Sequence, residues 1–478
     1  MRKINTLIIL FVLAVQAVGQ DNHYEFLRMG SRNSILANAG IARFEDQSAV
    51  IINPATLSFA NNSSFTFNTT AVGTSTIKFE NGLGQGFDIR YGNLTVLPNM
   101  AAGVIKPKEK ERDWVLGYGI YHRMNDKLRF ADRTNYSTNV INDVESPGDE
   151  SYLAQFNLSH DLDEVTVVLG AGWNLNEHFA FGISQYFTYR SEEFDSRFAA
   201  SALPFANSGA TMTGVTLTRD FHTSYYKVMA QTRVGIAWNL SKWDIGLTAM
   251  LPSLGIMGKG DIYAKAQLTN AATKPGNPRQ DYYANGYVEE VKSKYQHPLA
   301  ISLGVSRPFG SVRMYSAINY YSAVKNYSIM DPGPVDFIQP ATDSNVLYSS
   351  NAMRVAAGNQ RVINGSLGAD WEFRPNKHML FSVHTDKHFS NIDSSYQGHY
   401  LTVKNWDYVH VGMGISQSIG RSDWVFGLRY SFGGNDDAKQ PYSFDDPTEG
   451  NYLQGDRQTG KLTATSFQLM ISYAFRFK

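Results

Sequence analysis

The 478-residue chain contains no cysteine, which excludes disulfide bonds and thiolate metal sites. It also has no net charge, because 43 Lys and Arg balance 43 Asp and Glu. There is therefore neither a basic field to attract nucleic acid nor an acidic excess typical of disorder. Beyond the first twenty residues no apolar run approaches the roughly 18 residues of a membrane-spanning helix, and helical periodicity is nearly absent.

The N-terminus has the layout of a secretory signal peptide. Arg2 and Lys3 precede the apolar run 7–15, and small residues follow that run. The run is too short for a membrane anchor, so we expect residues 1–19 to be removed on export.

What the sequence has instead is alternation with a period of two. From Ile363 to Phe373 the odd positions are apolar or small and the even positions are mostly polar, and residues 165–175, 424–432 and 467–477 follow the same pattern. Aromatic residues make up 13% of the chain. Alternation predicts β-strands with one polar and one apolar face, which also occur in soluble sandwiches.

The connections between the predicted strands decide between the two classes of β protein. Tight turns alternate with long polar stretches, as in transmembrane barrels. The turns fall at 176–177, 241–242, 309–310, 375–376 and 420–421, and the long stretches at 125–150, 191–214, 270–281, 326–351, 391–405 and 433–460. With earlier strands at 64–79, 87–107 and 113–130, the sequence predicts an all-β fold, an antiparallel transmembrane barrel of about fourteen strands with both ends in the periplasm.

A barrel of this size has a lumen too wide for its own side chains to fill. About 40 residues lie between the signal peptide and the first strand, and they are rich in Ala, Ile and Leu. Within them the apolar run "AVIINPATLSF" must break at Asn53, because Pro54 disfavours helix at the residue before it. We therefore predict an N-terminal hatch at 20–60 inside a barrel at 61–478.

Three short motifs of this segment carry a resemblance to a known family. "NAGIA" (38–42), "EDQSA" (45–49) and "NPATL" (53–57) resemble the N-terminal hatch of outer-membrane long-chain fatty acid and hydrocarbon transporters of the FadL and TodX type. The resemblance implies a fourteen-stranded barrel that passively transports hydrophobic small molecules, with a movable hatch and a lateral exit into the membrane. Its implied hatch residues here are Asp46, Asn53, Pro54, Ala55 and Leu57, whereas no ligand-pocket residue can be matched.

A second function remains open at this point. Fourteen-stranded barrels of the PorV type, from bacteria with type IX secretion, look similar in the hatch but bind protein cargo or a secretion channel. The composition of the long loops does not discriminate between the two. In both cases we expect a monomer in the outer membrane of a Gram-negative bacterium, surrounded by membrane lipids and lipopolysaccharide, with no nucleic-acid partner.

Few residues suggest chemistry. The sequence has no Gly-x-Ser-x-Gly, no His-Glu-x-x-His and no phosphate-binding loop, so we expect no enzyme, no catalytic residue and no cofactor. His384, Asp386 and His388 share one face of a predicted strand, but strand spacing sets them in a line, so we expect polar residues lining the lumen rather than metal ligands. Pro98 interrupts the strand at 87–107 and marks either a kink in the wall or a harmless bulge.

Overall fold

The structure is a computed structural model that describes residues 22–27, 29–37, 39–107, 113–272, 278–333, 353–392, 396, 398–401 and 405–477. The predicted signal peptide lies outside these residues. The helical turns are η1 (Ala39–Ile41), α2 (Ala49–Ile52), η2 (Pro54–Phe59) and η3 (Glu449–Asn451). The strands are β1 (Ser64–Phe79), β2 (Ile89–Ile105), β3 (Trp114–Thr138), β4 (Glu150–Asn174), β5 (Phe179–Pro204), β6 (Val215–Asn239), β7 (Asp244–Met250), β8 (Leu254–Ala271), β9 (Gln280–Lys292), β10 (Ala300–Phe309), β11 (Val312–Tyr321), β12 (Val324–Met330), β13 (Val355–Asn359), β14 (Val362–Arg374), β15 (Lys377–Asp386), β16 (His399–Tyr400), β17 (Asp407–Ile419), β18 (Ser422–Lys439) and β19 (Thr459–Arg476).

The strands form a closed antiparallel barrel. Neighbouring strands pair around the ring from β5 back through β1 to β19 and on to β6, and the pairing of β5 with β6 closes it. Several wall strands are interrupted. β7 and β8 both pair with β6, and on their far sides β10 pairs with β7 and β9 pairs with β8. With each interrupted strand counted once, the predicted fourteen-stranded barrel is confirmed.

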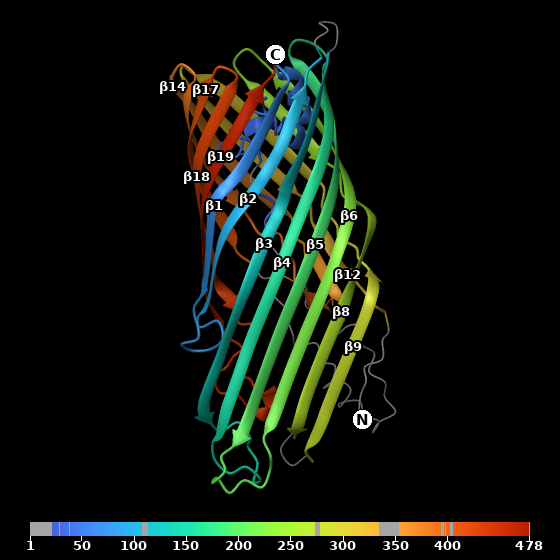
Figure 1. The fold of residues 1–478 in the computed structure, drawn as a ribbon, viewed down its shortest axis with the longest axis vertical. Helices are drawn as coiled ribbons and strands as arrows, with labels where there is room; N and C mark the ends of the chain where they lie inside the picture. The colour runs from blue at the N-terminus through green and yellow to red at the C-terminus, as the bar shows by residue number, and fades with distance from the viewer. Residues whose placement is uncertain are drawn as a thin grey trace.

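Among the four longest strands, two extend farther than the sequence predicted. β3 to β6 have 25 to 26 residues each, and two of them, β3 and β5, continue through stretches that the polar composition had assigned to loops from 125 and 191 (Figure 1). The prediction was wrong there because only the outer face becomes polar. The inner face keeps buried side chains, among them Phe156, Phe194 and Phe198, so the ladder remains supported beyond the membrane.

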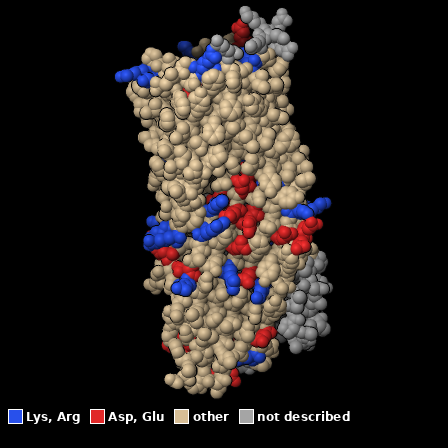
Figure 2. Space-filling model, in the orientation of Figure 1, with Lys and Arg blue, Asp and Glu red and all other residues tan. Residues whose placement is uncertain are grey.

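The outer surface shows where the membrane lies. Toward the end of the barrel that carries the tight turns, here called the turn end, the wall is almost free of charge, and a belt of mixed charges crosses it at mid-height (Figure 2). Along β4 and β5 the outward residues change from Val167 and Phe187 to Asp161 and Glu193. An apolar outer band on a closed barrel is built to span an outer membrane. No helix in the described ranges is long and apolar enough to cross a membrane.

Candidate functional site

The N-terminal segment, defined as the described residues of 22–60, lies inside the turn end of the barrel (Figure 1). As predicted, its apolar run breaks at Asn53: α2 ends there and η2 begins at Pro54. The Asn53 side chain accepts a hydrogen bond from Ala55 N (3.1 Å) and donates to Ile41 O (2.7 Å) and to Ile236 O of β6 (3.1 Å). One amide therefore joins the turn, the preceding chain and the wall.

Asp46 organises the same segment from within. Its buried carboxylate accepts hydrogen bonds from the backbone N–H groups of Asn33 and Ser48, both at 2.9 Å. The hydroxyls of Ser48 (2.5 Å) and Ser31 (3.3 Å) donate to it as well. Because a buried carboxylate with several donors fixes the backbone around it, this part of the segment has one defined shape.

The sequence reasoning missed the wall residues on which the segment rests. These are inward-facing glycines, and the segment lies so close to them that no side chain would fit. A Cβ at Gly246 would lie 1.7 Å from Ile41 O, one at Gly235 would lie 2.1 Å from Asn53 Oδ1, and one at Gly182 would lie 2.3 Å from Ala55 N. Four further wall glycines are approached in the same way by a side chain of the segment, namely Val50, Leu57 or Ile35. They are Gly117, Gly170, Gly172 and Gly427. The sequence feature that could have identified these wall residues is glycine at lumen-facing positions of predicted strands.

A cavity of about 110 Å³ lies between the segment and the wall. The segment supplies mainly apolar side chains, and the wall supplies most of the polar ones. Among the lining residues are Leu27, Met29, Ile41, Ile51 and Ile52 from the segment, and Tyr121, Arg123, Gln231, Arg233, Met250, His297 and Asn319 from the wall and its connections. Such a mixture of an apolar body and a few polar groups is typical of small-molecule sites.

A buried ion network adjoins this cavity. Arg123 pairs with Glu164 (2.8 Å), and Arg190 bridges Glu164 (3.0 Å) and Glu192 (2.8 Å). His160 lies 3.0 Å from Glu192. The side chains of all except Arg123 are fully buried. Since buried charges are tolerated when they are paired and hydrogen-bonded, this network gives the lumen beside the cavity a fixed polar wall.

The barrel wall has a gap between β2 and β3 beside the same cavity. β2 pairs with β1 along most of its length, but it pairs with β3 only from Met100 to Ile105. At Pro98 the register to β1 also shifts, and the ring of His122 on β3 lies 2.8 Å from Pro98 O. Beyond this point the outward side chains of Leu94 and Val96 are 71% and 70% exposed.

The three polar residues predicted to line the lumen are not brought together. His384 and Asp386 are buried, and the rings of His384 and His410 stack with centroids 4.4 Å apart. His388 lies beyond the end of β15, is partly exposed, and its Nδ1 lies 2.8 Å from the Asp407 carboxylate.

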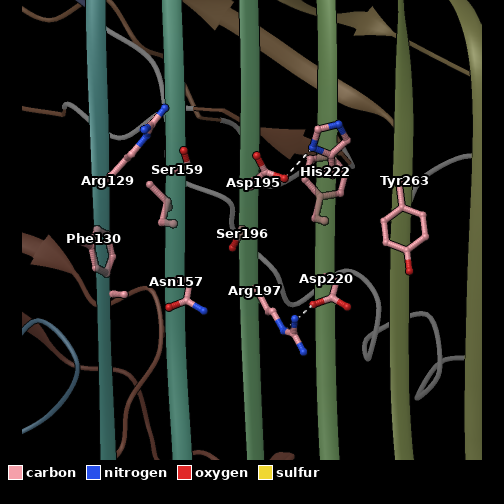
Figure 3. A pocket seen from close by; sticks show the side chains of 13 residues that line it. Arg129, Phe130, Asn157, Ser159, Asp195, Ser196, Arg197, Asp220, His222 and Tyr263 are labelled. Carbon is pink, nitrogen blue, oxygen red and sulfur yellow. Dashed lines mark hydrogen bonds and ion pairs between the residues drawn. The ribbon is translucent and has the colours of Figure 1, made fainter.

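A second hollow, of about 560 Å³, lies on the outside of the barrel across β3 to β8 (Figure 3). Its charged side chains pair with one another: His222 Nδ1 lies 2.6 Å from Asp195, and Arg197 lies 3.4 Å from Asp220. Glu193, Asp195 and His222 form the one group in the described ranges whose potential metal-ligand atoms lie within 4.8 Å of one another. These exposed residues belong to the belt of mixed charges outside the lumen.

The fold is similar to that of solved outer-membrane transporters. A FadL homologue from Pseudomonas aeruginosa matches with a TM-score of 0.57 at 12% identity, over 95% of this chain and 100% of that chain. The toluene transporter TodX from P. putida matches with a TM-score of 0.55 at 16% identity, over 95% and 99%. At these identities the likeness shows the fold alone. No family model and no curated protein matches the sequence.

Proposed function

We propose that the protein passively carries hydrophobic small molecules across the outer membrane, with the N-terminal segment acting as a hatch and the ligand leaving sideways into the membrane. The observation that carries this proposal is the position of the cavity. Tyr121 and Arg123 of β3 line it, and β3 loses its pairing with β2 at Tyr121. A ligand beside the hatch therefore lies just inside the place where the wall parts. The named activity of TodX, toluene transport, is consistent with this path.

The seating of the hatch favours a sideways exit over a passage along the barrel axis. The hatch backbone lies against Gly182 of β5 and Gly246 of β7, and the Asn53 side chain lies against Gly235 of β6 and donates a hydrogen bond to Ile236 O of the same strand. Moving it out of the way would break all of these contacts at once. Release between β2 and β3 would leave these contacts in place and would separate the His122 ring from Pro98 O.

Cross-linking the gap tests the sideways exit. Because the chain has no cysteine, Pro98→Cys with His122→Cys introduces the only two thiols at a site where the two residues already touch. We expect that closing the pair, by oxidation or with a short bis-maleimide, lowers cellular uptake of toluene and of oleate at least about fivefold. Reducing the disulfide should restore uptake. The matched control is Val167→Cys with Phe187→Cys, which face each other across the intact β4–β5 ladder.

Unchanged uptake in the cross-linked gap would contradict a sideways exit. Absence of any toluene or oleate uptake by the unmodified protein would contradict the transporter function itself. It would favour the alternative, a PorV-like barrel that binds protein cargo or a secretion channel.

A further inference from the structure

The polar side of the cavity beside the hatch contains hydrogen-bond donors that the protein does not use. Asn319, on β11, is only 3% exposed, yet its amide nitrogen makes no hydrogen bond to any described residue. The barrel is strongly hydrogen-bonded around it. A buried N–H donor without an acceptor costs free energy. The free amide nitrogen of Asn319 therefore indicates that a bound ligand supplies the acceptor.

Arg233, on β6, presents a second donor group to the same cavity. One of its terminal nitrogens donates to Ile52 O of the hatch (2.6 Å), another lies 3.3 Å from Met250 Sδ, and its Nε has no partner. No carboxylate in the described ranges forms an ion pair with it, whereas the neighbouring Arg123 pairs with Glu164. The guanidinium is therefore held in place by uncharged groups.

Two further polar side chains at the cavity, Gln231 and Glu25, are engaged. Gln231 donates to Leu251 O (3.1 Å) and its oxygen lies 2.8 Å from His297 Nδ1. Glu25 accepts a hydrogen bond from the Tyr321 hydroxyl (3.2 Å). No described residue supplies an acceptor for the Asn319 amide nitrogen or for Arg233 Nε.

The geometry points to a ligand of a particular class, and this inference rests on the proposed function. We propose that the cavity selects a compact molecule, a single ring or a short chain, whose carbonyl or carboxylate oxygen accepts hydrogen bonds from Asn319 and Arg233. The size follows from the volume, since about 110 Å³ is comparable with cavities of about 150 Å³ that hold benzene. The apolar body of the ligand lies against Ile51 and Ile52 of the hatch.

Three probes of similar shape separate oxygen recognition from apolar binding: acetophenone, benzoate, and α-methylstyrene, in which a CH₂ group replaces the oxygen of acetophenone. Binding is measured by equilibrium dialysis of the full chain in a zwitterionic detergent, with protein-free micelles as the reference. We expect acetophenone or benzoate to bind at least about tenfold more tightly than α-methylstyrene, and the comparison of the two shows whether the oxygen is neutral or charged.

The variants Asn319→Leu and Arg233→Met should abolish this preference, and heat-modifiable migration on gels shows that each variant is folded. Asn319→Asp, which puts an acceptor in place of the donor with little change of shape, should do the same. The control Asn285→Leu, on β9 outside the cavity, should change nothing.

Equal binding of all three probes, or a preference that survives Asn319→Leu and Arg233→Met, overturns the inference and leaves the proposed function standing. Failure of every probe to bind overturns the inference too. It counts against uptake through this cavity only if cells producing the protein also fail to take up toluene and oleate.

Discussion

At the scale of single residues, glycines of the wall give the N-terminal segment the room to lie against the strands. A strand glycine normally weakens a sheet because it packs nothing. Here the missing side chain lets a second backbone lie against the wall, as Ile41 O does at Gly246 and Ala42 N does at Gly304. The sequence showed glycine in the lumen-facing register, but it did not show which chain segment approached each one, because that depends on how the hatch folds around Asp46 and Asn53.

Gly246→Ala tests this seating. The new methyl group would overlap Ile41 O, so the hatch must shift, and we expect a loss of about 1 to 3 kcal/mol in the free energy of unfolding, as for an overpacked core. Planar-bilayer recordings should show larger ion conductance than for the unmodified protein. The control is Gly365→Ala, where a Cβ meets nothing within 4 Å. Equal stability and conductance of the two variants would show that the hatch does not rest on the wall glycines.

At the scale of elements, the sequence predicted the turn end better than the loop end. All five predicted tight turns lie where strands reverse, because alternation ends abruptly there and the outer face is uniformly apolar. At the loop end the prediction made β3 and β5 too short, because their outer faces become polar where the strands are still paired with their neighbours. Of the site, Asn53 was predicted from its motif. Asn319 was not, because it is one of many polar residues on the lumen face of a strand.

The loops beyond these strands are joined by a charged clamp. The Arg279 guanidinium lies 2.7 Å from Glu449 and 3.1 Å from Asp143, which belong to different loops. The N–H of Glu145, together with Arg279, lowers the pKa of the Asp143 carboxyl below its ordinary value. Because the pKa is lowered in the folded protein, this contribution is present above the ordinary value near 4 and is lost only as the pH falls through the lowered pKa.

We therefore expect the clamp to be constant between about pH 5 and 8 and to open only below about pH 4. Spin labels placed on loop 139–149 and near Glu449 would report the opening as a longer and broader distance. Arg279→Gln should open the loops at pH 7 and raise the rate of limited proteolysis several-fold, whereas Arg133→Gln, on an exposed strand face, should not. Loops that open between pH 5 and 8 would contradict this account.

At the scale of the whole molecule, two features determine what the barrel can do. Closure through β5 and β6 completes a ring of hydrogen-bonded strands, as a barrel in lipid requires, and β2 and β3 part beside the cavity. Closure alone would leave a wet pore, since the lumen of fourteen strands exceeds what side chains fill. The N-terminal segment occupies this lumen with apolar residues and leaves a small cavity where the wall parts. The proposed path for apolar molecules therefore depends on the segment and the gap together.

Deleting residues 21–57 tests the role of the segment as a plug. Ser184, Tyr186 and Arg233 of the wall donate hydrogen bonds to the carbonyl oxygens of Val50, Ile51 and Ile52, so without the segment these donors turn to water. We expect a barrel that still assembles, as judged by heat-modifiable migration on gels, but conducts ions and admits small antibiotics.

Hydrophobic uptake should fall at the same time, because the cavity loses its apolar side even as the pore becomes wetter. Asn53→Ala, which removes only the amide that joins the turn to Ile41 and Ile236, should produce both effects more weakly. A truncated barrel that stays closed to ions and takes up oleate or toluene at the original rate would show that the segment is neither plug nor part of the site. The transporter function would then lose its main structural support.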